Sequence, residues 1–532
     1  MKNWKFRLLA VAALVIIFQS CTDDLNVALE DDDQFMSEEF FSSPASYKQA
    51  LGGVYGNLCL TGANGAGSSF LEGIDAGTSQ FGRCWWYLQN LTTDEVVWSY
   101  ENDAGTRELN RNIWASENPI LLGMFSRTMA QVALVNEYLR QTSPDKLDSR
   151  GVSDQALRAE IELYRKEART LRAYAYYVMM DLYGKAPFIT ENDPLNFAGP
   201  EYDRNELFTY VENELTELIP DLKPARTNEY GRLDQAFAQM VLAKMYLNAE
   251  VYIGQNRYND CITQVNNVIN GGYALEANYL DNFKADNDTS TEMIFTLQSD
   301  GTVTQHYGAT TVMINGSVGS IEQNGASIGV SSGGWGGALR VRKQFVQKWD
   351  ATGLVNDARN TIISGNRLVD ITDIADRDEG YIVAKFSNIS STGTAGPSTT
   401  FVNTDFPLFR LADAYLMYAE ATLRGGNGSM TQALDYVNAL RTRANNGTPG
   451  GNIAMNDLTL DFIIDERSRE LYWEGHRRQD LIRFNRYTGG TYNWAWKGNA
   501  ANGIPISNNF KVFPLHVLTL ASNPNLTQNA GY

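Results

Sequence analysis

Hydrophobic positions recur along most of the chain with the spacing of α-helices. The longest series alternates steps of four and three through Leu157, Ile161, Tyr164, Ala168, Leu171, Ala175, Val178 and Leu182. This spacing places one apolar stripe along a helix, and Gly184 and Pro187 mark its end. A shorter series from Leu207 to Leu218 predicts another helix, which ends before Pro220.

Two helix pairs are predicted on either side of a long insertion. The first pairs residues 235–250 with 258–269, and the second pairs residues 411–424 with 431–444. Helix pairs of about 34 residues are typical of tetratricopeptide-like repeats, in which each pair buries its apolar face against a neighbour. The pattern therefore predicts a mainly α-helical fold built on an α-solenoid scaffold.

The composition changes between these two pairs. Residues 299–337 and 387–404 are rich in Gly, Ser, Thr and Asn, and short alternating runs at 293–297 and 381–384 predict strands. A loop-rich insertion this long is usually functional or disordered. Trp335, inside "GGWGG", favours a function, and between two glycine pairs we expect its ring to have few packing neighbours. We interpret residues 21–532 as a single domain in which irregular stretches, around 60–115 and 280–405, interrupt the helical scaffold.

The net charge of −18 makes the whole chain strongly acidic. A chain of this charge has no long-range attraction to phosphate backbones, so the sequence argues against nucleic-acid binding. A composition of 43% hydrophobic and 20% charged residues is that of a globular protein.

The N-terminus has the order of a bacterial lipoprotein signal. Basic residues at Lys2, Lys5 and Arg7 precede an apolar run that ends at Phe18, and Cys21 follows just before two aspartates. We predict that residues 1–20 are a signal peptide and that Cys21 is lipidated, although Phe18 stands where such signals usually carry leucine. An uncleaved anchor and an ordinary secretory signal are the alternatives.

Motifs for catalysis or metal binding fail on their context. The three other cysteines have no CxxC spacing, and the three histidines lie far apart, so neither a zinc site nor a disulfide framework is predicted. Asp94 and Glu95 are adjacent and point apart on any regular element, so the pair alone does not make a glycosidase dyad. We therefore predict no catalytic residue, no metal and no cofactor.

The stretch "RELYWEGHRRQDLIRF" at 469–484 holds the densest polar chemistry of the chain. Helical spacing predicts three ion pairs, namely Glu474–Arg478, Arg477–Asp480 and Asp480–Arg483. Because every charge would have a local partner, nothing would shift a pKa as a catalytic group requires. We interpret the stretch as scaffold.

Aromatic residues gather in "RCWWYLQNLTTDEVVWSYEND", which contains Trp85, Trp86 and Trp98. Sugar-binding surfaces combine flat apolar faces with carboxylates, amides and guanidinium groups, and this segment has that mixture. Packing in the core is the alternative and holds for some of these rings.

Several phrases together resemble the SusD/RagB family of nutrient-binding surface lipoproteins of Gram-negative bacteria. They include the lipoprotein cysteine, "FFSSPASYKQALGGVYGNL", "EARTLRAYAYYVMMDLYGKAPFIT", "FRLADAYLMYAEATL", "ERSRELYWEGHRRQDLIRF" and "NPNLTQNAGY", in the order of the family. The resemblance implies four tetratricopeptide-like helix pairs and an irregular half that carries the ligand site. It also implies glycan binding without cleavage, a lipid anchor on the outer surface of the outer membrane, and a SusC-like TonB-dependent transporter as partner.

On this resemblance we predict Trp85, Trp86, Trp98 and Trp335 as glycan-binding residues. Trp494 and Trp496 lie in "TYNWAWKG", which looks like a shared family element, and we interpret them as structural. Two alternatives remain open: a peptide- or protein-binding member of the same scaffold, and a glycoside hydrolase. The hydrolase requires a cleft with two carboxylates about 5–10 Å apart.

Overall fold

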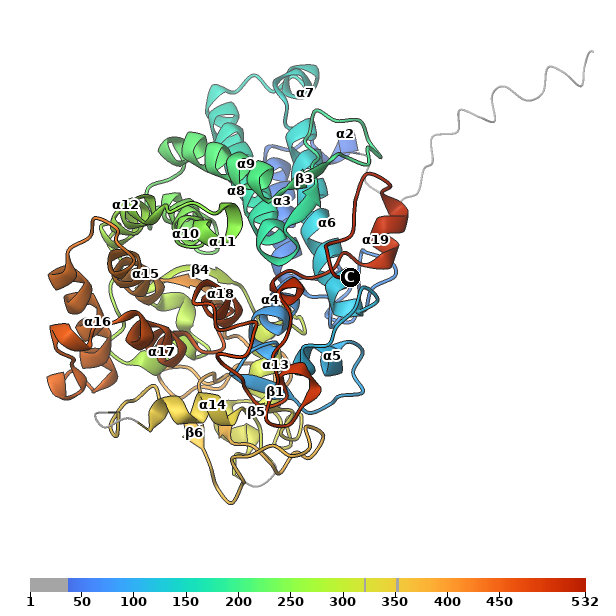
Figure 1. Ribbon diagram of the computed structural model, residues 1–532. Helices are drawn as coiled ribbons and strands as arrows, with labels where there is room; N and C mark the ends of the chain where they lie inside the picture. Colours follow the sequence, from blue (N-terminus) through green and yellow to red (C-terminus); the bar gives the residue numbers. More distant parts are fainter. Residues whose placement is uncertain (1–36, 320–321, 351–353) are drawn as a thin grey trace, which may run out of the picture.

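The computed structural model describes residues 37–319, 322–350 and 354–532 (Figure 1). The predicted signal peptide and Cys21 lie outside the described residues. Helices dominate the described part and the strands are short, which confirms the prediction of a mainly α-helical fold.

Long helices pack as four successive pairs. These pairs are α3 (Pro44–Cys59) with α6 (Pro119–Gln141), α8 (Gln155–Leu182) with α9 (Arg204–Leu218), α10 (Gln235–Leu247) with α12 (Tyr258–Ile269), and α15 (Leu411–Leu423) with α16 (Met430–Ala444). Helix α6 also packs on α8, and α12 packs on α15, so neighbouring pairs bury their apolar faces against each other (Figure 1).

Helix α8 illustrates how the sequence directs this packing. Asp154 accepts hydrogen bonds from the backbone of the first turn, and Gly184, with φ of 71°, ends the helix region. The predicted stripe is buried from Ile161 to Leu182. Each fully buried large side chain of such a stripe contributes roughly 1.5–3 kcal/mol.

The remaining described helices are short. They include α2 (Ser37–Phe40), α5 (Thr106–Arg111), α7 (Pro144–Ser149), α11 (Ala249–Ile253), α14 (Lys343–Val346) and α19 (Val517–Ser522).

Two-stranded ribbons tie the irregular stretches to the helices. Strand β4 (Met293–Leu297), which lies where a strand was predicted, pairs with β8 (Phe406–Arg410), so residues 298–405 leave and return at neighbouring strands. The predicted strand at 381–384 contains β7 (Ile382–Val383), which pairs with β6 (Ile362–Ile363). A further ribbon joins β2 (Lys185–Pro187) to β3 (Glu201–Asp203).

One ribbon joins the two irregular stretches to each other. Strand β1 (Val96–Trp98) pairs antiparallel with β5 (Leu339–Val341), with Trp98 opposite Leu339. Helix α4 (Phe81–Trp86) and the π-helical turn η1 (Tyr87–Leu91) lead into β1. Helix α13 (Ala309–Gly316) packs on α4, and these elements lie together below the helical stack (Figure 1).

The stretch at 469–484 is not one continuous helix. Helix α17 (Leu460–Leu471) ends before Trp473 and Gly475, whose φ values of 64° and 80° are left-handed, and α18 (Arg477–Arg483) then begins. The predicted pair Glu474–Arg478 is therefore wrong, because the break removes the helical spacing on which it depended. The predicted pair Arg477–Asp480 is also wrong, although both residues lie in α18, because Arg477 pairs with Asp94 and Asp480 pairs with Arg467 and Arg483. The pair Asp480–Arg483, which lies within α18, is confirmed at 2.7 Å.

Long-range partners replace the local ones. Glu474 lies 2.6 Å from both Lys385 Nζ and Arg410 Nε. The three side chains are almost entirely shielded from solvent, and Arg410 also contacts Glu292 and Glu470 at 2.7 Å. Glu474 thus has buried cationic partners on both carboxylate oxygens, which agrees with the interpretation of this stretch as scaffold.

Replacing Glu474 by alanine should destabilise the protein strongly. The change leaves Lys385 and Arg410 buried beside each other, and breaking a buried pair costs about 3–5 kcal/mol. Burial already lowers the pKa of Lys385 to about 8, so loss of its proton will relieve part of that cost. Denaturant unfolding at pH 7 measures the change. Asp461→Ala removes only an exposed ion pair with Arg486 and should cost less than about 1 kcal/mol; equal losses in both variants would contradict the argument.

A second buried carboxylate lies at the start of β1. Glu95 accepts hydrogen bonds from Asn90 Nδ2 at 2.7 Å and from the backbone N–H of Trp473 at 3.2 Å. Burial raises the pKa of Glu95 to about 7, although the charge of Arg477 opposes that shift. Since this pKa is higher in the folded than in the unfolded chain, Glu95 stabilises the fold below about pH 4.5, and this stability is lost as pH rises through 7.

Glu95→Gln should therefore become relatively more stable than the wild type as pH rises. We expect similar unfolding free energies at pH 5 and an advantage for the variant on the order of 2–3 kcal/mol at pH 8. Urea unfolding at several pH values measures the difference. The exposed Glu72→Gln serves as control and should show no such trend; the same pH slope in wild type and Glu95→Gln would refute the shift.

Candidate functional site

The β1–β5 ribbon opens onto a cleft of about 580 Å³. Its walls come from segments far apart in the sequence, namely Gly67, Asp75, Ala76, Gly77, Arg83, Trp98, Tyr100, Asp103, Tyr307 and Trp335. The cleft therefore draws on both irregular stretches that the sequence singled out.

Three aromatic rings form one fixed wall of the cleft. Trp98 makes edge contacts with Tyr100 and with Trp335, at ring-centroid distances of 5.8 and 6.1 Å. The Tyr100 hydroxyl donates a hydrogen bond to the carbonyl of Trp335 at 2.6 Å and receives one from Arg377 at 3.2 Å. Trp98 is only 2% exposed, whereas Tyr100 and Trp335 are half-buried, so these two rings present the larger surfaces.

The glycine loop positions Trp335 by its backbone. Gly334 has φ of 45°, and a Cβ there would lie 2.5 Å from Val318, so the loop approaches α13 more closely than another residue would permit. The N–H of Trp335 donates to the carbonyl of Asn315 at 2.9 Å. The Trp335 ring is half-buried and packs edge-on against Trp98, which agrees with the expectation that it is less enclosed than a core tryptophan.

Polar groups border the aromatic wall. Arg83 is only 7% exposed, and its Nε donates to the Tyr87 hydroxyl at 3.0 Å, which fixes the guanidinium beside the cleft. Asp75 accepts hydrogen bonds from the backbone N–H and the hydroxyl of Thr78 at 2.7 and 2.9 Å. Asp103 accepts one from the indole N–H of Trp98 at 2.9 Å.

The surroundings of Asp75 favour its ionised form. Burial alone would raise the pKa of Asp75, but the Thr78 hydrogen bonds and the charge of Arg83 outweigh burial and lower it. Asp75 is therefore ionised at neutral pH and acts as a hydrogen-bond acceptor. Carboxylates and guanidinium groups beside flat rings can hold the hydroxyls and the apolar faces of sugars.

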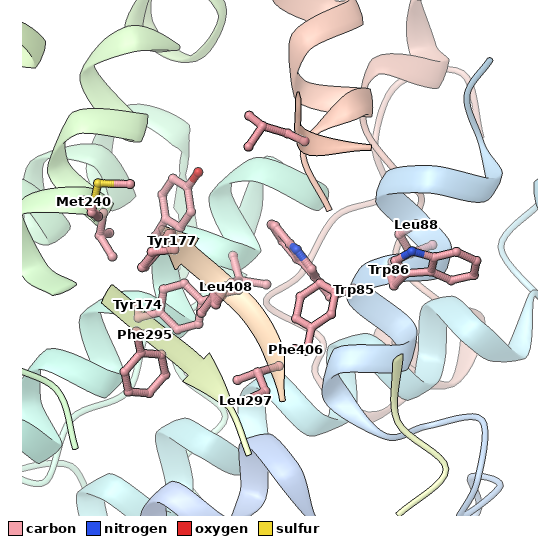
Figure 2. Close-up of a cluster of buried hydrophobic side chains, with 14 of the residues drawn as sticks. Trp85, Trp86, Leu88, Tyr174, Tyr177, Met240, Phe295, Leu297, Phe406 and Leu408 are labelled. Carbon is pink, nitrogen blue, oxygen red and sulfur yellow. The ribbon is translucent and has the colours of Figure 1, made fainter. Parts of the chain in front are cut away.

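The structure divides the four predicted tryptophans. Trp98 and Trp335 line the cleft. Trp85 and Trp86 are 3% and 0% exposed and lie in the main hydrophobic core (Figure 2). The prediction that Trp85 and Trp86 bind glycan is therefore wrong, because both lie in the buried helix α4. Trp98, in contrast, is the last residue of β1 and borders the cleft. Trp494 is fully buried and Trp496 packs against Ile371, in agreement with structural roles.

Tyr307 is the residue that sequence reasoning missed. It lines the cleft, and its ring packs against Phe401 at a centroid distance of 5.2 Å. The available signal was an aromatic residue within a loop rich in Gly, Ser and Thr, which also drew attention to Trp335.

No cluster of metal ligands and no membrane-spanning helix occurs among the described residues. Among them, no group of three or more His, Cys, Asp or Glu side chains is placed to hold a metal ion. None of the described helices combines the length and the apolar character needed to cross a membrane. Within the same part of the chain, Cys59, Cys84 and Cys261 carry free thiols.

Known proteins match most or all of this chain. The model of the SusD family matches residues 240–532. The starch-binding protein SusD of Bacteroides thetaiotaomicron is 31% identical over all of both chains. A SusD-like protein of Bacteroides ovatus is 22% identical over 94% of this chain and 87% of its own length.

Solved structures share the fold. A laminarin-binding SusD-like protein superposes with a TM-score of 0.68 at 20% identity, covering 92% of this chain and 99% of its own. Surface glycan-binding protein A from Bacteroides fluxus gives 0.69 at 18% identity, with 92% and 100% covered. The likeness in fold and the identity to a full-length relative agree with the resemblance seen in the sequence. The chain belongs to the SusD family.

Proposed function

We propose that this protein binds glycans in the cleft between β1 and the Gly333–Gly337 loop, without cleaving them. The observation that carries the proposal is the fixed wall of Trp98, Tyr100 and Trp335, bordered by Arg83 and Asp75. The names of relatives, which specify starch, laminarin and surface glycans, support the same ligand class.

The size of the wall implies weak binding. Stacking one sugar on Trp335 buries about 50–80 Å² of apolar surface, which contributes roughly 1–2 kcal/mol at about 25 cal/mol/Å². Lost translational and rotational freedom offsets much of the gain, so we expect dissociation constants on the order of micromolar to millimolar. Because the rings are already fixed by Tyr100 and Asn315, binding need not order the wall itself.

The carboxylates argue against hydrolysis. A glycosidase needs one carboxylic acid with a raised pKa to protonate the leaving group. Asp75 has a lowered pKa, and Asp103 already accepts the indole N–H of Trp98. The cleft is therefore better suited to holding hydroxyls than to donating a proton.

We further propose that the protein is attached to the outer membrane at the cell surface through lipidated Cys21. In this proposal it passes glycans to a SusC-like TonB-dependent transporter. The basic, apolar and then acidic order of residues 1–24 supports the anchor, and membership of the SusD family supports the transporter.

Trp335→Ala should weaken glycan binding about five- to thirtyfold, because it removes roughly 1–2 kcal/mol of stacking. The melting temperature should fall by only a few degrees, since the ring is half-buried and contributes mainly its edge contact with Trp98. Isothermal titration with a glycan identified by array screening measures the change. Trp496→Ala, a half-buried tryptophan outside the cleft, should leave the affinity unchanged.

The same glycan should show no release of reducing ends during prolonged incubation with the protein. Release that disappears in Asp75→Asn or Asp103→Asn would identify a hydrolase instead. Failure to bind any glycan on the array, together with binding of peptides in the cleft, would favour the peptide-binding alternative.

Cys21→Ala should move the mature protein from the membrane fraction to the soluble fraction of the cell envelope. Each buried acyl CH₂ contributes about 0.8 kcal/mol, so two or three acyl chains anchor a protein stably and their loss releases it. Fractionation followed by immunoblotting measures the distribution. Retention of the variant in the membrane fraction would refute the anchor.

A further inference from the structure

We propose that the protein has a second sugar-binding site, in a separate cavity of about 290 Å³ between α3 and β4. The cavity would take one ring of a neutral glycan. This inference rests on the proposed glycan binding for its ligand class but concerns other residues. Its floor is apolar and buried, and is made of Leu51, Leu58, Phe295 and Leu297.

Two glycines of α3 make room for the cavity. Gly52 and Gly56 lie one helical turn apart and both border it, and a Cβ on either would meet nothing within 4 Å. Glycine inside a helix costs about 1 kcal/mol relative to alanine. Gly52 and Gly56 therefore lower the stability of α3, and both lie on the face of the helix that borders the cavity. Gly53 lies on the adjacent face and does not border this cavity.

An exposed tyrosine ring stands at the mouth. Tyr230 is 48% exposed, yet its hydroxyl hydrogen-bonds the carboxylate of buried Asp405 and the hydroxyl of Thr296, the latter at 2.8 Å. Tyr230 also borders a neighbouring hollow of about 230 Å³, so the ring lies between two concave surfaces. An anchored ring that remains open to solvent is the element on which a sugar ring stacks.

The loop that carries this ring is held in place. Gly231 has φ of 78°, and a Cβ there would lie 2.2 Å from Gln298 Nε2. The left-handed backbone at Gly231 therefore favours glycine, and the space that a Cβ would fill is occupied by the side-chain amide of Gln298. The ring is thus placed before any ligand arrives.

The charges around the cavity favour a neutral ligand. Lys48 is paired with Glu229 at 2.7 Å, and Arg232 is paired with buried Glu167. The half-buried amide of Gln298, in contrast, has no hydrogen-bond partner among the residues that the structure describes. A ligand that combines an apolar face with hydroxyls, as a neutral sugar ring does, matches the apolar floor and this amide.

The cavity and the cleft are joined by shared segments. Thr304 borders the cavity and Tyr307 the cleft, and three residues span at most about 11 Å. Leu60 borders the cavity and Gly67 the cleft, and seven residues span at most about 25 Å. One glycan of several sugars could therefore occupy both sites, and the second contact would then benefit from a high effective concentration.

Hydrogen–deuterium exchange with maltoheptaose and laminariheptaose, two neutral heptasaccharides, tests the proposal on the full mature protein. In a Trp98→Ala/Trp335→Ala variant, which weakens the cleft, we expect millimolar glycan to still protect residues 51–60 and 226–233. Gly56→Leu fills the cavity and should abolish that protection. It should also weaken heptasaccharide binding by the otherwise intact protein about five- to tenfold. Gly53→Leu, the matched control, should do neither.

Each outcome separates the two sites. Protection of the cleft segments alone, or equal effects of Gly56→Leu and Gly53→Leu, would overturn the second site and leave the cleft standing. In the wild-type protein, protection of residues 51–60 and 226–233 without protection of the cleft segments would support the second site and count against the cleft. Protection of neither would count against both. Melting curves will show that both leucine variants fold, as the higher helix propensity of leucine predicts.

Discussion

A buried ion pair fixes the strand that carries the cleft to the helical scaffold. Arg477, at the start of α18, contacts both carboxylate oxygens of Asp94 at 2.7 and 2.8 Å, and Lys348 and the Tyr492 hydroxyl contact the same group. Asp94 lies four residues before Trp98. Buried pairs of this kind add little net stability relative to apolar packing, but a buried carboxylate without its partners would be costly. The cluster therefore adds little to the net stability of the fold. Its main effect is on the position of β1, because any other position would leave the Asp94 carboxylate buried without its partners.

Buried arginines extend this constraint across the irregular half. Arg342, directly after β5, donates hydrogen bonds to the carbonyls of Val96, Leu91 and Asn110. Burial lowers the pKa of its guanidinium to about 9, and it remains charged at neutral pH. Loops have few internal backbone hydrogen bonds, and a multidentate donor satisfies several carbonyls at once. This explains how segments with little regular structure hold an aromatic wall in place.

The sequence alone predicted those elements whose structure is determined by neighbouring residues. Helices such as α8 followed from periodicity, and β4 followed from alternation and its flanking residues. Helix α13 was not predicted because all of its residues are buried. A helix without a solvent-exposed face shows no alternation of apolar and polar positions with the helical period. The ion pairs of Glu474 were missed because left-handed Trp473 and Gly475 interrupt the helix, and because Lys385 and Arg410 are distant in sequence.

The candidate site shows the same limit more sharply. Trp86 and Trp98 share one aromatic segment and are both buried, yet Trp98, at the end of β1, borders the cleft and Trp86 does not. The two residues differ because Trp98 lies opposite Leu339 in the β1–β5 ribbon, which brings Trp335 against its ring. The Trp86 ring packs instead against Trp473. The β1–β5 pairing joins residues more than two hundred positions apart, and no local pattern encodes its register.

The same pairing also bears on the kind of glycan that fits. The cleft is bordered by the guanidinium of Arg83 and by the carboxylates of Asp75 and Asp103, and the guanidinium of Arg377 contacts the Tyr100 hydroxyl of its wall, within a chain of net charge −18. Salt screens the distant charges over about 8 Å, so the local balance decides, and it does not favour an anionic sugar. A neutral glycan pays no electrostatic penalty on binding, and its hydroxyls can donate hydrogen bonds to the fixed carboxylates. Fixed rings with a near-balanced border therefore select by shape and hydroxyl pattern rather than by charge.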